Sequence, residues 1–82
     1  MDIQKFTALS ADERARVLWS EGQFLDTVNY FRYKAYLYSL NNFFVEVMCY
    51  QGSTQIESIE PCNDQTLLKF LNRIDIHELY VA

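Results

Sequence analysis

The sequence is poor in residues that cross-link a chain or interrupt its regular structure. Its 82 residues include two glycines, one proline and two cysteines, Cys49 and Cys62. Two cysteines are too few for a disulfide-stapled scaffold, and their separation matches no zinc-knuckle or redox pair. We therefore expect both to be free thiols, with Cys49 serving as a small apolar residue of a strand.

Long apolar runs and glycine-rich loops are also missing. The longest uninterrupted apolar stretches are a few residues, whereas a membrane-spanning helix needs about 20. Because Gly22 and Gly52 are the only glycines, no phosphate-cradling or nucleotide-binding glycine pattern exists. The first residues lack the basic stretch and apolar run of a secretory signal. These absences predict a soluble cytoplasmic domain with no membrane partner.

Positive charge is scarce and unevenly placed. Seven basic and eleven acidic residues give a formal net charge of −4. Residues 1–42 are neutral, so the acidic excess falls in residues 43–82, where six acids face two bases. A negative surface repels phosphate backbones, so we expect no nucleic-acid partner. The excess suits an ordinary acidic surface or a basic protein partner.

What the chain does have is apolar and aromatic content. Half of the residues are hydrophobic and 16% are aromatic, which excludes a disordered chain. The length allows one core, so residues 1–82 should form a single small domain.

A capping box marks the start of the first predicted helix. Ser10 and Glu13 are three residues apart, the spacing at which each side chain satisfies the other residue's free amide. The residues expected to face the core are Ala15, Leu18 and Trp19, and those expected to face solvent are Arg14 and Arg16.

Gly22 is the expected end of this helix. Helices commonly end at a residue with left-handed, positive φ, which glycine adopts without strain. The alternative is a helix that continues to Val28, with Gly22 on its packed face beside Leu18 and Leu25. We favour the stop, and we expect Gly22 to have positive φ.

After Gly22 the sequence changes to aromatic and β-branched residues with a period of two, which is typical of strands. The predicted strands are Gln23–Tyr30, Arg32–Leu40, Phe43–Tyr50 and Gln55–Glu60, with turns at Asn41-Asn42 and Gln51–Thr54. The connections are too short for parallel crossovers, which need about a dozen residues. The sheet should therefore be an antiparallel meander.

The C-terminal part of the sequence predicts helices. Pro61 should end the sheet, because it has no amide hydrogen to donate. Asn63 or Asp64 then caps a helix. Its core stripe comprises Leu67, Leu71 and Ile74, and a last short helix is expected over Asp75–Tyr80. The fold class is therefore α+β: an N-terminal helix, a four-stranded antiparallel meander and one or two C-terminal helices.

The turn at Asn41-Asn42 determines which side chains share a face of the sheet, because it pairs residues whose numbers add up to 83. One face carries Lys34, Tyr36, Tyr38, Leu40, Phe43, Val45, Val47 and Cys49. The other carries Tyr33, Ala35, Leu37, Ser39, Phe44, Glu46, Met48 and Tyr50. Neither face is polar, unlike that of an ordinary half-exposed sheet. We expect the helices to cover one face and another partner to cover the second. The alternative is that the helices divide between the faces.

Residues suited to catalysis are few. His77 is the only histidine and has no metal-binding or triad spacing, so we expect it on the surface of the last helix. Glu46 alternates into an apolar strand, which fits either a half-buried acid–base carboxylate or a cross-strand pair with a residue such as Lys34. No second acid completes a catalytic pair. We expect no catalytic residue, no metal site and no cofactor.

Three segments carry a resemblance to known proteins: Gly22-Gln23-Phe24-Leu25, Leu37-Tyr38-Ser39-Leu40 and Phe44-Val45-Glu46-Val47. Over residues 10–80 the chain resembles a group of small uncharacterised bacterial α+β proteins with a short N-terminal helix, a strand meander and a C-terminal helix. The resemblance implies the same fold and a helix end at Gly22. It implies no activity.

The surplus of aromatic residues, without a convergent polar cluster, predicts a non-enzymatic protein-interaction or regulatory module. The candidate interface residues are Tyr33, Tyr36, Tyr38, Phe44, Met48 and Tyr50. A homodimer would hide such a surface, because two-fold pairing uses the same patch on both chains. The alternative function is an acidic inhibitor-like protein, of immunity or antitoxin type, that binds a basic protein. An enzyme ranks third.

Overall fold

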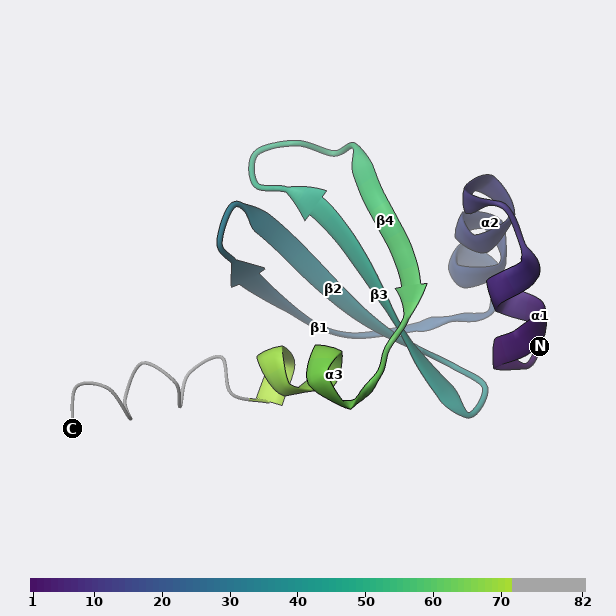
Figure 1. Ribbon diagram of the computed structural model, residues 1–82. Coiled ribbons are helices and arrows are strands. Elements are labelled where there is room, and N and C mark those ends of the chain that lie inside the picture. Colours follow the sequence, from purple (N-terminus) through teal and green to yellow (C-terminus); the bar gives the residue numbers. More distant parts are fainter. Residues whose placement is uncertain (72–82) are drawn as a thin grey trace.

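The computed structural model describes residues 1–71 as helices packed on a four-stranded sheet (Figure 1). Helices α1 (Ile3–Ala8) and α2 (Ala11–Glu21) come first. They precede strands β1 (Gln23–Tyr30), β2 (Tyr33–Leu40), β3 (Phe43–Tyr50) and β4 (Ile56–Pro61), and α3 (Asp64–Leu71) follows. Each strand pairs antiparallel with the next, in the order β1-β2-β3-β4. The α+β meander with helices before and after it is therefore confirmed. The predictions for Ile74, His77 and a last helix over Asp75–Tyr80 lie outside the described residues.

The predicted register of β2 and β3 is confirmed. The pairs run from Tyr33 with Tyr50 to Leu40 with Phe43, so every pair adds up to 83. Asn41 has a φ of 55°, a left-handed conformation that asparagine tolerates in tight turns. Pro61 is the last residue of β4, an edge strand, where its missing amide hydrogen is tolerated.

The capping box of α2 is also confirmed. The Ser10 hydroxyl accepts a hydrogen bond from the Glu13 amide at 3.2 Å, and the Ser10 amide donates to the Glu13 carboxylate at 3.0 Å. Hydrogen bonds from Ser10, first from its backbone and then from its side chain, lower the pKa of the Glu13 carboxyl. Asn63 provides the corresponding cap of α3, because its side-chain oxygen accepts from the Thr66 amide at 2.8 Å.

The helix end at Gly22 is as predicted, but the expected positive φ is wrong. Gly22 has φ −79° and ψ 158°, an extended conformation open to any residue. A Cβ atom at this position would lie 2.7 Å from the Leu18 carbonyl oxygen and 2.9 Å from Leu18 Cδ1. The junction between α2 and β1 therefore requires glycine for space rather than for left-handed geometry.

Arg14 does not face solvent as expected, because it joins α2 to two other elements. Its guanidinium donates to the carbonyl oxygens of Phe6 at 3.2 Å, Thr7 at 2.7 Å and Ile59 at 2.7 Å. It also pairs with the Glu60 carboxylate at 3.1 Å. Helix α1, an addition to the predicted elements, is held against β4 by these contacts and by the fully buried Phe6.

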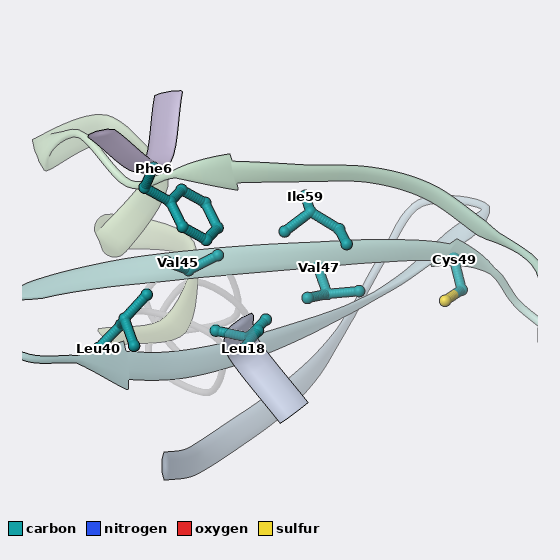
Figure 2. Packing of buried hydrophobic residues seen from close by; sticks show 7 residues of the cluster. All are labelled: Phe6, Leu18, Leu40, Val45, Val47, Cys49 and Ile59. Atoms are coloured by element: carbon teal, nitrogen blue, oxygen red, sulfur yellow. The ribbon is translucent and has the colours of Figure 1, made fainter. Parts of the chain in front are cut away.

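The helices divide between the two faces of the sheet. Phe6 of α1 and Leu18 of α2 pack on one face (Figure 2), against Leu40, Val45, Val47, Cys49 and Ile59. Phe70 of α3 packs on the other face, against Ala35 and Leu37. The expectation that the helices cover one face only is therefore wrong, and the alternative arrangement is the one present. Each short helix covers part of a face, which leaves part of each face open.

Candidate functional site

A groove opens on the α2 face of the sheet, beside the core. It encloses about 230 Å³ and lies between α2 and the connection from β3 to β4. We call it the aromatic groove. Its lining residues are Trp19, Tyr36, Tyr38, Val47, Cys49, Ser53, Thr54 and Ile56. Cys49 marks the end of the core cluster away from Phe6 (Figure 2), so the groove begins where the helical cover stops.

Aromatic rings contact one another along one side of this groove. The ring of Trp19 lies 5.5 Å from that of Tyr38, centre to centre and tilted by 50°. Phe24 of β1 continues the row, at 5.6 Å from Tyr38 and 6.4 Å from Tyr36. Trp19 is 53% exposed, so the expectation that it faces the core is wrong. Its ring rests on Tyr38 and leaves an edge open to solvent.

Two polar groups in the groove have a raised pKa, which favours their uncharged forms. Burial, followed by the nearby Tyr36 and Cys49, raises the pKa of the Tyr38 phenol. Burial and then Glu57 raise the pKa of the Cys49 thiol. A protonated thiol is a poor nucleophile and a poor metal ligand, so Cys49 contributes mainly apolar surface. Lys34 Nζ lies 5.8 Å from the centre of the Tyr36 ring and contributes a positive charge.

The six candidate interface residues fall into two groups, as the confirmed register requires. Tyr36 and Tyr38 lie in the groove. Tyr33, Phe44, Met48 and Tyr50 share the opposite face. There, the rings of Tyr33 and Tyr50 stack at 4.9 Å, while Met48 packs against the core cluster that includes Phe70 of α3. Phe44 is 41% exposed. The six residues therefore belong to two separate surfaces, as the predicted pairing of β2 and β3 requires.

Glu46 is buried by α3 rather than poised for acid–base chemistry. The residue is 8% exposed, and its carboxylate forms an ion pair with Lys69 of α3. Lys69 Nζ also lies 4.6 Å from the centre of the Tyr30 ring. The expected cross-strand partner, Lys34, is on the opposite face, so that alternative is wrong. The pair anchors α3 to the sheet.

Both cysteines are free thiols, as predicted. Burial, with a further contribution from Glu46, raises the pKa of Cys62 to about 12 despite the opposing effect of Lys69. Within the described part of the chain, no three His, Cys, Asp or Glu side chains are placed to hold a metal ion. Among residues 1–71, no helix combines the length and apolar character that crossing a bilayer requires.

Several groove residues were not among those predicted from the sequence. The sequence predicts Trp19 in the core, and Ser53, Thr54 and Ile56 in a turn and a strand without a site role, whereas all four line the groove. Of these residues, Trp19 has a signal in the sequence: it is the single tryptophan of the chain and lies shortly before Gly22, the glycine that ends the helix. The position of the β3–β4 connection above the sheet has no such local signal.

Comparison with known proteins gave no match: no family model, no curated protein and no solved structure is significantly similar to the chain.

Proposed function

We propose that this domain is a non-enzymatic protein-interaction module that binds a segment of another protein in the aromatic groove. The observation that supports it is an open row of rings beside a closed core, with Trp19 half exposed over Tyr38. Tyrosine and tryptophan are enriched at interfaces, because they bury a large apolar ring while the polar end stays hydrated. Free cysteines agree with a cytoplasmic setting for this interaction.

The size of the groove favours side chains of a protein over a small-molecule substrate. Its volume of about 230 Å³ is below the roughly 300–1,000 Å³ of ligand pockets. It suits one or two apolar side chains presented by a larger surface. The protonated Cys49 thiol and Tyr38 phenol provide weak polar contacts there, and neither group is activated for chemistry.

A second copy of this chain is the alternative partner, as in the homodimer expected from the sequence. The sequence predicts a homodimer from an apolar face left without helical cover, whereas helices pack on both faces, Leu18 of α2 on one and Phe70 of α3 on the other. Sedimentation equilibrium at tens of micromolar separates the two cases. A monomer agrees with a different protein as partner, and a dimer dissociated by Tyr38→Lys assigns the groove to self-pairing.

The acidic-inhibitor function is the second candidate, and Glu57 near the groove is the observation that favours it. Two of the six acids in residues 43–82 are already paired inside the domain, Glu46 with Lys69 and Glu60 with Arg14. An inhibitor of a basic protein would show an association rate that falls steeply with added salt. Binding through the aromatic groove alone should change little with salt.

The test is capture from a native-host extract with a matched pair of variants. Tyr38→Lys places a charge in the groove, whereas Phe44→Lys places the same charge on an exposed aromatic site of the opposite face. We expect wild type and Phe44→Lys to retain the same protein, and Tyr38→Lys to lose it. Trp19→Ser, at a half-exposed position, repeats the test if Tyr38→Lys fails to fold, as judged by circular dichroism. Equal capture by all folded variants would reject the groove as the binding site.

A further inference from the structure

The tip of the β1–β2 hairpin holds a phenylalanine in a conformation that disfavours it. Phe31 and Arg32 form the two-residue loop, and Phe31 has a φ of 57°. Only the first loop residue has positive φ, which is the pattern of a type II′ turn, where glycine is preferred. The β2–β3 turn provides an internal comparison, because Asn41 occupies its equivalent position at a φ of 55°. A bulky residue with positive φ is an outlier.

Packing does not explain why Phe31 is there. It is 82% exposed, the largest exposed fraction among the large apolar side chains of residues 1–71. Its ring meets Tyr30 edge-on, at 4.6 Å between centres, and the remaining surface faces solvent. A residue that is both strained and exposed contributes little to the stability of the fold. Backbone outliers of this kind concentrate at functional positions.

The loop backbone is held firmly by Gln51. Its side-chain amide donates hydrogen bonds to the carbonyl oxygens of Phe31 at 2.8 Å and Tyr33 at 3.3 Å. Its backbone amide donates to the carbonyl oxygen of Arg32 at 2.9 Å. The stacked rings of Tyr33 and Tyr50 support the loop from one face. An anchor that is already ordered loses less conformational entropy on binding than a flexible one.

Charge at the tip has the opposite sign to that of the whole chain. The loop carries Arg32 and no acid, whereas the net charge of the protein is −4. The ammonium of Lys34 lies over the Tyr36 ring on the groove face, so Arg32 provides the positive charge of the tip. A ring flanked by a guanidinium is complementary to an apolar pocket with carboxylates at its rim, and Arg is among the commonest anchor residues at interfaces.

We propose that the hairpin tip is a second contact, at which Phe31 enters an apolar pocket of a different protein and Arg32 pairs with a carboxylate at the rim of that pocket. The inference rests on the proposed interaction function but uses a surface on the other face from the aromatic groove. A concave pocket surrounds a projecting ring, whereas two such tips would touch on one side only, far short of the roughly 800 Å² that each chain buries in a stable dimer. Net negative charge disfavours anionic membranes as the target.

The first stage of the test places the photoreactive residue p-benzoylphenylalanine at position 31 of the full chain in its native host, with position 44 as the matched exposed aromatic control. We expect irradiation to link position 31 to one protein and position 44 to none. That protein is then purified and titrated against unlabelled variants. Phe31→Asn should weaken binding about tenfold or more, while its thermal midpoint stays equal to or above that of wild type. Arg32→Glu should weaken binding further at low salt than at high salt.

Each other outcome overturns the inference. In the crosslinking experiment, these are no adduct at position 31 or an adduct only between two copies of this chain. In the titration, it is wild-type affinity of Phe31→Asn for the purified protein. A membrane target would instead be shown if the wild type sedimented with phosphatidylcholine–phosphatidylserine vesicles and Phe31→Asn did not. Titrating Tyr38→Lys against the same purified protein keeps the two sites apart. If Tyr38→Lys alone loses binding, the groove is the binding site and the tip is rejected as a contact. If Phe31→Asn alone loses binding, the tip is the contact and the groove is rejected as the binding site.

Discussion

Two basic residues, Arg14 and Lys69, attach the helices to the sheet. Arg14 bridges α1, α2 and β4 through three carbonyl oxygens and Glu60, which uses the fork geometry that lysine lacks. Lys69 attaches α3 through Glu46 and the Tyr30 ring. Both cations have partners within the domain, but the two acids differ. Glu46 is buried with Lys69, whereas the Glu60 side chain stays 60% exposed beside Arg14.

Removing the cation from the Glu46–Lys69 pair should be more harmful than removing both members. Lys69→Met leaves a buried carboxylate without a partner and should lower the free energy of unfolding by about 3 kcal/mol. The double variant Glu46→Gln, Lys69→Met should regain most of that loss, because an uncharged amide is cheaper to bury. Urea denaturation measures both. Lys34→Met, on the opposite face, is the control and should lose less than about 1 kcal/mol. A double variant as unstable as the single one would contradict this account.

At the scale of elements, the junction between α2 and β1 depends on Gly22. Gly22→Ala should lower the free energy of unfolding by about 1–2 kcal/mol, because the added Cβ meets Leu18 below 3.0 Å. Gly52, at φ 81° with open space around it, is the matched control. Asparagine should be better tolerated than alanine at Gly52, where φ is positive, and no better than alanine at Gly22. Thermal denaturation of the four variants measures this, and rescue by asparagine at Gly22 would show that its conformation is left-handed after all.

The elements were predictable where their signals are local. The Asn41-Asn42 turn fixes the β2–β3 register, and with it the two faces, because a turn of two residues leaves one pairing. The capping box at Ser10 and the glycine at position 22 likewise set the limits of α2. Helix α1 is only six residues long, and its one cue is Asp2, whose carboxylate accepts from the Lys5 amide. Such a helix has little periodicity to detect.

The groove and the ion pairs were not predictable, because they join residues far apart in the sequence. Arg14 meets Ile59 and Glu60, and Lys69 meets Glu46, at separations that no spacing rule covers. The division of helices between the two faces has the same origin. The amphipathic patterns of the helices are satisfied whether the helices pack on one face of the sheet or on both. Which arrangement forms depends on the connections between the elements and on the total apolar area that is buried.

At the scale of the whole molecule, two open surfaces remain after the helices have packed. The aromatic groove lies on the α2 face, and the hairpin tip carries its stacked tyrosines on the α3 face. The proposed function assigns the groove to a segment of another protein, and the further inference assigns the tip to a pocket. Either surface alone is small for a stable complex, so using both would provide the area that one lacks.

Titration of the purified partner, monitored by the fluorescence of the single tryptophan, tests the central claim most directly. Trp19 forms one wall of the groove and is half exposed, so occupancy should exclude water from its ring. We predict a saturable blue shift of its emission at one partner per chain, retained by Phe44→Lys and abolished by Tyr38→Lys. Binding of Tyr38→Lys with wild-type affinity, or saturation of the wild type with no change in Trp19 emission, would contradict the assignment of the groove.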